Sequence, residues 1–370
     1  YGFLSENADF SEVCREHGLV FIGPPPEVLA KFHDKSATRT LMRQYGLPIV
    51  PGSDGPVRTV SEALRVSEAI GYPVMLKARA GGGGRGMRKA ESARDIQRMW
   101  DQARGEAKAS FGDEGIYIER NLEGVRHIEA QILADEHGNT ICFGERECSI
   151  QRRNQKVIEE APSASIGLEL QHRIARLAAD AARRAGYRNI GTWEFLVDQQ
   201  GDPYFIEVNA RIQVEHTVTE MVTGVDLVKE QIALASGEPL SISEEQVWVK
   251  GHAIECRINA EDPAANFAPS TGVLTTYMPP GGPGIRVDSH CFQGYEVPPY
   301  YDSLLAKVIA WGRDRPEAVA RMQRALDEFT IAGVTTNIAA HKKILASDLF
   351  REGKVTTHLI DTVGIEALVG

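Results

Sequence analysis

The chain has 370 residues, of which 42% are hydrophobic and 25% charged, a composition typical of a globular protein with two or three subdomains. Its formal net charge of −10 argues against a nucleic-acid partner, and no apolar stretch reaches the roughly 20 residues that span a membrane. The five scattered cysteines form no C-x-x-C pair and indicate reduced thiols, so we expect a cytoplasmic protein, with a mitochondrial-type compartment as the alternative.

Residues 1–49 begin with "YGFLSEN" and continue with a predicted strand, "LVFIGPP" (19–25), and a predicted helix over 27–46. A strand and a helix need further strands beside them, so we interpret this segment as the remnant of an N-terminal α/β subdomain. A strand edge left without a partner would be prone to association.

Residues 50–121 are expected to form a second subdomain around "YPVMLKARAGGGGRGM" (72–87), in which a strand ends in Lys77 and a glycine loop follows. Glycine N–H groups can cradle phosphate oxygens, and the lysine supplies positive charge. The spacing matches neither a P-loop nor a dinucleotide-binding fingerprint. A flexible surface turn is the alternative interpretation.

Residues 122–370 alternate strands and helices, and "GTWEFLVDQQGDPYFIEVNARIQVEH" (191–216) predicts a β-hairpin. We expect residue 198 to pair with 203, which places Glu194 opposite Glu207. The alternation then sorts the side chains into two faces. The core face receives Trp193, Phe195, Val197, Ile206 and Val208, and the other face receives Glu194, Glu207, Asn209, Arg211 and Gln213.

Two carboxylates directly opposed across strands repel each other, so we expect a cation between them. Carboxylate and amide oxygens without softer ligands favour Mg²⁺ or Mn²⁺. A solvated outer face is the alternative. Together with Lys77 and the glycine loop, these residues predict a nucleoside-triphosphate site divided between two lobes.

Five blocks carry a family resemblance: "YGFLSEN", "RECSIQRRNQK", "FIEVNARIQVEHTVTE", "ECRINAEDP" and "VPPYYDSLLAK". They resemble the biotin carboxylase component of biotin-dependent carboxylases, which are ATP-grasp ligases. The resemblance implies an α/β (α+β) ATP-grasp fold, with a lid subdomain at 50–121 and a C-terminal biotin carboxylase subdomain at 122–370. It also implies that the first part of the N-terminal subdomain is lacking. Asn154 stands where many members have histidine, so it is left out of the predicted catalytic residues.

The implied reaction is the ATP-dependent carboxylation of biotin with bicarbonate, through carboxyphosphate, as the first half-reaction of a biotin-dependent carboxylase. The implied cofactors are ATP and Mg²⁺ (or Mn²⁺), with biotin as a carrier-bound substrate. The implied partners are a biotin carboxyl carrier protein or domain, a carboxyltransferase component and a second copy of the chain in a homodimer.

The resemblance also assigns site residues. The ATP-binding set is Lys35, Lys77, Gly82, Gly83, Gly84, Met87, Glu119, Leu122, His127, Gln151 and Leu196. The metal ligands are Glu194, Glu207 and Asn209. The catalytic set is Lys156, Arg211, Glu215 and Arg257, and the bicarbonate and biotin set is Arg211, Gln213, Val214, Arg257 and Tyr1.

Glu215 would be the base that deprotonates bicarbonate, and this role suits a carboxylate whose pKa is raised. Arg257 would stabilise the biotin enolate, because a guanidinium fixed in advance favours developing negative charge.

Two other functions stay open at this point. Another ATP-grasp ligase, of the carbamoyl-phosphate type, would share the lysine, the glycine loop and the E-x-N block, although "RIQVEH" favours biotin carboxylase. A truncated ATP-binding fragment without activity is the second. The final carboxyl acceptor is also open among acetyl-CoA, propionyl-CoA, other acyl-CoA, pyruvate and urea.

Overall fold

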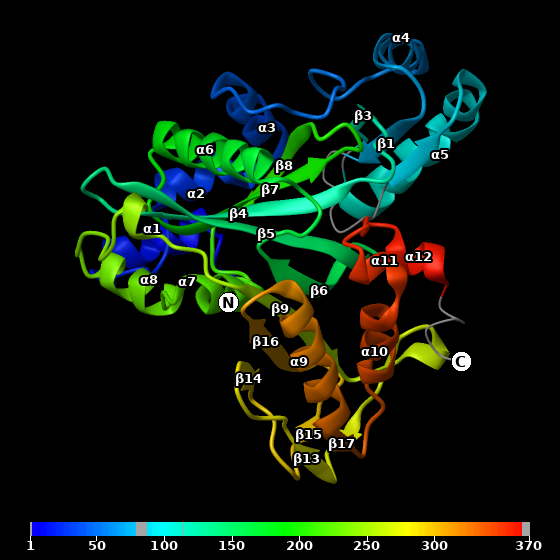
Figure 1. Cartoon of the computed structure of the whole chain (residues 1–370). Helices are drawn as coiled ribbons and strands as arrows, with labels where there is room; N and C mark the ends of the chain where they lie inside the picture. Colours follow the sequence, from blue (N-terminus) through cyan, green and yellow to red (C-terminus); the bar gives the residue numbers. More distant parts are fainter. Residues whose placement is uncertain (1, 79–86, 113, 365–370) are drawn as a thin grey trace.

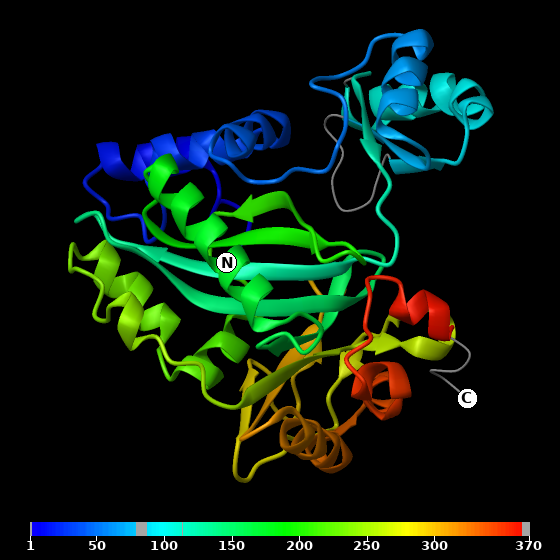
Figure 2. The same ribbon diagram turned by 45° about the horizontal axis from the view of Figure 1, so that its top comes forward.

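The computed structural model describes residues 2–78, 87–112 and 114–364, without the side chains of residues 35, 36, 110 and 111. N-terminal helices lie beside a large antiparallel sheet, and a smaller sheet with two helices stands apart from it (Figure 1; Figure 2). The structure confirms the expected mixed α/β class.

The N-terminal helices are α1 (Ala8–Glu16), α2 (Pro26–His33) and α3 (Lys35–Gln44). The prediction of one helix over 27–46 is wrong at its centre. Asp34 has extended backbone angles, φ −92° and ψ 114°, and its Oδ1 accepts a hydrogen bond of 2.8 Å from the Ala37 N–H. An aspartate in this position caps a new helix, so α2 ends and α3 begins there.

The predicted strand over 19–25 is also wrong, because these residues pair with no strand in the part of the chain that the structure describes. Leu19 and Val20 are 63% and 71% exposed. Strand backbone is stabilised by hydrogen bonds to a neighbouring strand, and an apolar sequence without such a neighbour stays irregular.

The small sheet has the strand order β2-β1-β3 with both pairs antiparallel. Its elements are α4 (Val60–Ile70), β1 (Val74–Ala78), β2 (Met87–Ala90), α5 (Ala93–Phe111) and β3 (Ile116–Arg120). Val74 and Leu76 of β1 face the core formed with Ile96 and Trp100 of α5. Strand alternation therefore turns Met75 and Lys77 to the opposite side.

The large sheet has eight strands in the order β14-β16-β9-β6-β5-β4-β7-β8, and every neighbouring pair is antiparallel. Its strands are β4 (Arg126–Ala134), β5 (Thr140–Arg152), β6 (Gln155–Ala161), β7 (Asn189–Val197), β8 (Pro203–Asn209), β9 (His252–Asn259), β14 (Ile285–Ser289) and β16 (Leu304–Gly312).

Helices cover both faces of this sheet (Figure 1). They are α6 (Leu168–Ala185), α7 (His216–Thr223), α8 (Leu227–Ala235) and α9 (Arg315–Glu328). The apolar side chains of α6 and α9 join cores on one face, and those of α7 and α8 join cores on the other. Glu194, Glu255 and Arg257 alternate with core residues of the first face, so they point to the second.

The remaining elements are short. They are η1 (Glu244–Gln246), β10 (Glu261–Asp262), η2 (Pro263–Ala265), β11 (Ala268–Pro269), β12 (Gly272–Val273), β13 (Thr276–Met278), β15 (Glu296–Val297), β17 (Thr330–Ala332), α10 (Ile338–Ala346), α11 (Asp348–Arg351) and α12 (Leu359–Val363). Within the described residues, no helix combines the length and the apolar character that crossing a membrane requires.

The β7–β8 hairpin confirms that Glu194 lies opposite Glu207, but the register near the turn is wrong by one residue. Val197, not residue 198, pairs with Pro203, and a bulge between Phe195 and Glu194 restores the predicted pairing. The bulge places Phe205 in the core and turns Ile206 toward the cleft described below, so the expected assignment of Ile206 to the core is wrong.

All five cysteines are free thiols, as their spacing predicted.

Candidate active site

A cleft of about 1350 Å³ lies between the small subdomain and the large sheet. The small subdomain contributes Met75, Lys77 and Glu119, and the large sheet contributes residues of several strands. All four predicted catalytic residues line this cleft: Lys156, Arg211, Glu215 and Arg257. The tertiary structure therefore gathers side chains that lie about a hundred positions apart in the chain.

Most of the predicted ATP-binding residues line the same cleft: Lys77, Met87, Glu119, Leu122, His127, Gln151 and Leu196. Lys35 is the first residue of α3, and its side chain is outside the described part of the structure. Gly82, Gly83, Gly84 and Tyr1 also lie outside the described residues.

Glu119 neutralises two cations at the small-subdomain side of the cleft. It forms ion pairs with Lys77 and with Arg39, a residue of α3 that the sequence did not single out. Arg39 belongs to no recognisable motif and approaches Glu119 only because α3 folds back toward β3. Phosphate oxygens entering here would compete with Glu119 for both cations.

Glu194 is a cleft carboxylate that contacts several polar side chains. Its Oε1 accepts hydrogen bonds of 2.9 Å each from Lys156 Nζ, Asn209 Nδ2 and Gln213 Nε2. Its Oε2 lies 2.9 Å from His127 Nε2. Burial favours the neutral acid, but Lys156 and His127 outweigh burial and hold the pKa of Glu194 well below its ordinary value.

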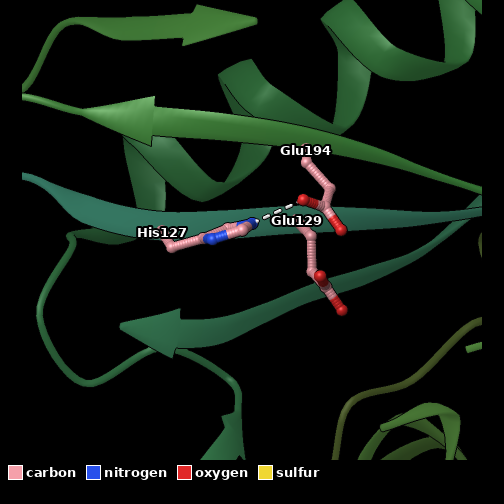
Figure 3. Close-up of side chains that lie close together, drawn as sticks. All are labelled: His127, Glu129 and Glu194. Carbon is pink, nitrogen blue, oxygen red and sulfur yellow. Dashed lines mark ion pairs between the residues drawn. The ribbon is translucent and has the colours of Figure 1, made fainter. Parts of the chain in front are cut away.

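Glu194 on β7 lies between two other glutamates, Glu207 on the neighbouring strand β8 and Glu129 on the neighbouring strand β4. The expected repulsion therefore involves three carboxylates. Figure 3 shows His127 and Glu129 on one strand with Glu194 on the next, close enough for one cation to contact all three. That place is taken by the Lys156 ammonium, 2.5 Å from Glu129 and 2.9 Å from Glu194. Glu129 was not predicted from the sequence, because it lies within an apolar strand pattern.

A divalent ion would therefore bind on the Glu207 side of Glu194. Two carboxylates and an amide oxygen form a set of hard ligands that fits Mg²⁺. The Asn209 amide now directs its Nδ2 toward Glu194 and its Oδ1 toward Arg211, so it would have to turn over to ligate an ion beside Glu194.

Glu215 and Arg257 lie side by side, with Arg257 Nη2 2.9 Å from Glu215 Oε2. Lys156 Nζ lies 2.5 Å from Glu215 Oε1. Burial would raise the pKa of Glu215, but Lys156, Arg257 and Arg146 together hold it below its ordinary value. The pKa of Glu215 is therefore lowered in this structure, whereas a general base is expected to have a raised pKa.

The segment after β8 is held by partners that the sequence did not indicate. Glu6, within the N-terminal "YGFLSEN", accepts from Arg211 Nε at 3.0 Å and from the Ala210 N–H at 2.8 Å. Lys307 of β16 donates to the Val214 carbonyl at 2.8 Å. The N-terminal segment and a C-terminal strand thus fix the two ends of "RIQVE".

Three family descriptions match the chain in succession. "Biotin carboxylase, N-terminal domain" matches residues 1–29, and "Carbamoyl-phosphate synthase L chain, ATP binding domain" matches residues 34–243. "Biotin carboxylase C-terminal domain" matches residues 255–362. The middle description alone would also fit a carbamoyl-phosphate enzyme, but the two flanking descriptions name biotin carboxylase.

The biotin carboxylase of Nostoc sp. is 53% identical over 360 residues, which cover 97% of this chain and 80% of that protein. The biotin carboxylase domain dimer of Hydrogenobacter thermophilus 2-oxoglutarate carboxylase, solved with MgADP, ADP and bicarbonate, superimposes with a TM-score of 0.94. It is 47% identical, and the match covers 100% of this chain and 81% of that chain.

Campylobacter jejuni biotin carboxylase, in complex with a β,γ-ATP compound, gives a TM-score of 0.93 at 45% identity, over 98% of this chain and 81% of that chain. Identity near one half along nearly the whole chain, together with the fold, shows the family. The chain belongs to the biotin carboxylase family of ATP-grasp enzymes.

Proposed function

We propose that this chain carboxylates biotin with bicarbonate at the expense of ATP, through carboxyphosphate, and that the biotin is carried by a separate protein or domain. The observation that carries this proposal is the meeting of Lys156, Glu215 and Arg257 in one cleft with Glu194, facing Lys77 of the small subdomain. Cations for two anionic substrates and a carboxylate base are thus within reach of each other.

In the proposed reaction, Lys77 and Arg39 leave Glu119 to hold ATP phosphates on the small-subdomain side. Glu194 and Glu207 would hold Mg²⁺ (or Mn²⁺), which would neutralise charge on the phosphate oxygens. A lysine and an arginine suit these anions because both carry fixed positive charge and several donors.

Bicarbonate would bind between Arg211, Gln213 and Lys156, next to Glu215. An entering anion draws Lys156 and Arg257 toward itself, and each loses part of its contact with Glu215. Burial then dominates the pKa of Glu215, which rises toward the range of an effective base. Glu215 takes the bicarbonate proton, and the resulting anion attacks the terminal phosphorus of ATP, whose bond to the β-phosphate oxygen breaks and releases ADP.

Carboxyphosphate then breaks down to CO₂ and phosphate, the released phosphate takes the N1′ proton of biotin, and the resulting enolate attacks CO₂. Arg257 would stabilise the enolate oxygen, and the contact of its Nη2 with a carboxylate oxygen in the cleft supports this role.

The proposed partners are a biotin carboxyl carrier protein or domain and a carboxyltransferase component that determines the carboxyl acceptor. The Hydrogenobacter thermophilus domain is described as a dimer. We propose a homodimer for this chain as well.

Five free thiols are consistent with a reducing compartment such as the cytoplasm.

ADP release with Mg-ATP, measured with and without bicarbonate and with and without free biotin, tests the proposal. We expect release that requires bicarbonate and increases with biotin. Release that ignores bicarbonate, or ATP binding without any release, would contradict biotin carboxylation by the chain as it stands.

A further inference from the structure

Arg146 of β5 lies behind the cleft and is completely buried. Its guanidinium donates to side chains of β4, β7, α7 and the segment after β8. The acceptors are Glu129 Oε1 at 2.5 Å, Gln131 Oε1 at 2.6 Å, Thr219 Oγ1 at 3.0 Å, Thr192 Oγ1 at 3.3 Å and Gln213 Oε1 at 3.3 Å. Arg146 therefore ties together four parts of the chain that meet only in the folded structure.

Two of these acceptors lead directly into the cleft. Glu129 gives one oxygen to Arg146 and the other to Lys156, at 2.5 Å each. The Gln213 side-chain oxygen accepts a hydrogen bond from Arg146, and its Nε2 donates a hydrogen bond of 2.9 Å to Glu194. Thr192 and Thr219 do not line the cleft, so their bonds to Arg146 do not reach it directly.

An arginine side chain can only donate hydrogen bonds, whereas a glutamine amide has one accepting and one donating end. Arg146 must therefore face the oxygen of Gln213, and this turns the NH₂ group toward the cleft. A lysine keeps the charge, but its ammonium offers three donors from one point and cannot reproduce the planar guanidinium.

We propose that Arg146 is a positioning residue that orients the Gln213 amide, and through it the donor group presented to bicarbonate. This inference rests on the proposed function. An amide free to turn would present its oxygen to the anion in part of the molecules, and bicarbonate would bind more weakly while ATP binding is preserved.

The test is Arg146→Lys, which keeps the positive charge beside Glu129. Substitution of the residues that orient metal ligands from behind typically costs about 10- to 100-fold in affinity, and we expect the same range for a residue that orients an anion-binding amide. We expect KM for bicarbonate to rise by that factor with KM for ATP nearly unchanged. Equal rises in both KM values, or none in either, would overturn the proposal.

A double variant separates positioning from general loosening. If Arg146 acts through Gln213, Arg146→Lys combined with Gln213→Ala binds bicarbonate no more weakly than Gln213→Ala alone. If the two substitutions together weaken bicarbonate binding by the product of their separate effects, the proposal is contradicted. Thr192→Val is the matched control: it removes one acceptor of Arg146 that does not reach the cleft, and KM for bicarbonate should stay at the wild-type value.

Bicarbonate binding can also be read without turnover, from the rise in Tm that bicarbonate causes in the presence of Mg-ADP. This readout tests Arg146 even if ADP release fails and the proposed function is wrong. If Arg146→Lys does not fold, Arg146→Gln with Glu129→Gln removes both buried charges together. Compared with Glu129→Gln alone, that variant should show the same selective loss of bicarbonate binding, and equal binding would overturn the proposal.

Discussion

At the scale of single residues, Glu215 has an environment that works in two directions. Burial raises its pKa, and the three cations Lys156, Arg257 and Arg146 lower it further than burial raises it. Two of these cations face the cleft and are the groups that anionic substrates would engage. In the reaction we propose, substrate binding would therefore raise the basicity of Glu215, whose carboxylate is ionised before bicarbonate binds.

We predict that Glu215→Gln keeps ATP binding but lowers bicarbonate-dependent ADP release by about 10²- to 10⁴-fold, the usual contribution of a positioned general base. The amide keeps the shape and cannot take a proton. Titration with ATP and the ADP-release assay measure the two effects. Glu220→Gln, a buried glutamate of α7 that pairs with Arg286 outside the cleft, is the control. Unchanged turnover of Glu215→Gln would remove this residue as the base.

We predict that Arg257→Ala impairs biotin carboxylation more than biotin-independent, bicarbonate-dependent ATP hydrolysis, because only the first reaction develops an enolate. Arg257 also lies 2.5 Å from the completely buried Glu159, so its loss costs about 3–5 kcal/mol of stability if Glu159 stays charged. Both assays should therefore be run at a temperature well below the Tm of the variant. Equal losses in the two assays would make Arg257 a structural residue.

At the scale of elements, β6 and β9 place Glu159 directly opposite Glu255, and both are completely buried. Burial, helped by the charge of Glu255, raises the pKa of Glu159 to about 8 against the pull of Arg257. Burial, helped by the charge of Glu215, raises the pKa of Glu255 to about 7 against the pull of Lys307 and Arg257. Near neutral pH, the side chains of Glu159 and Glu255 therefore keep protons that ordinary glutamates have lost.

This pair predicts a pH-dependent stability. Between the ordinary glutamate pKa of about 4.3 and the folded values, these carboxyls are protonated in the folded chain and ionised in the unfolded chain. The folded state then binds more protons, so the free energy of unfolding falls as pH rises, by up to about 1.4 kcal/mol per pH unit for each group.

Thermal unfolding across pH 5 to 8 measures this effect, and Glu159→Gln with Glu255→Gln should flatten the decline in Tm across that window. The exposed Glu352→Gln is the control. A decline of the same slope in the double variant would show that other groups cause it.

At the scale of the whole molecule, the N-terminal residues include several exposed large apolar side chains: Phe3, Leu4, Phe10, Val13, Leu19, Val20 and Ile22. Exposed apolar side chains concentrated in one segment favour association with other apolar surfaces. The subdomain boundaries near residues 49 and 121 remain our proposal for how the chain divides around the cleft.

We predict that the chain self-associates with increasing concentration and that Leu19→Ser with Val20→Ser weakens this association by roughly tenfold or more, since each apolar side chain buried in a contact contributes roughly 1.5–3 kcal/mol. Sedimentation equilibrium measures the change. Trp248→Ser, which alters an exposed apolar side chain in another part of the surface, should have no such effect. Association that is unaffected by the double variant would place the contact elsewhere.

Much of the site was predictable because its residues lie in short motifs with local periodicity. The hairpin composition placed Glu194 opposite Glu207, and the strand before the glycine loop placed Lys77 on the same side as Met75. The error at Ile206 arose from a bulge, which depends on how β7 and β8 twist together and leaves no reliable mark in the sequence.

The sequence by itself determined the family and the ATP-grasp fold, and it predicted the residues that we propose contact ATP, bicarbonate and biotin, because these lie in contiguous blocks. Only the tertiary structure showed Arg39, Glu129, Arg146 and Lys307, each of which reaches the site across strands or from a distant helix. The lowered pKa of Glu215 could also be found only from the tertiary structure. A pKa depends on the burial and charges around a group in space, and most of those neighbours are remote in the chain.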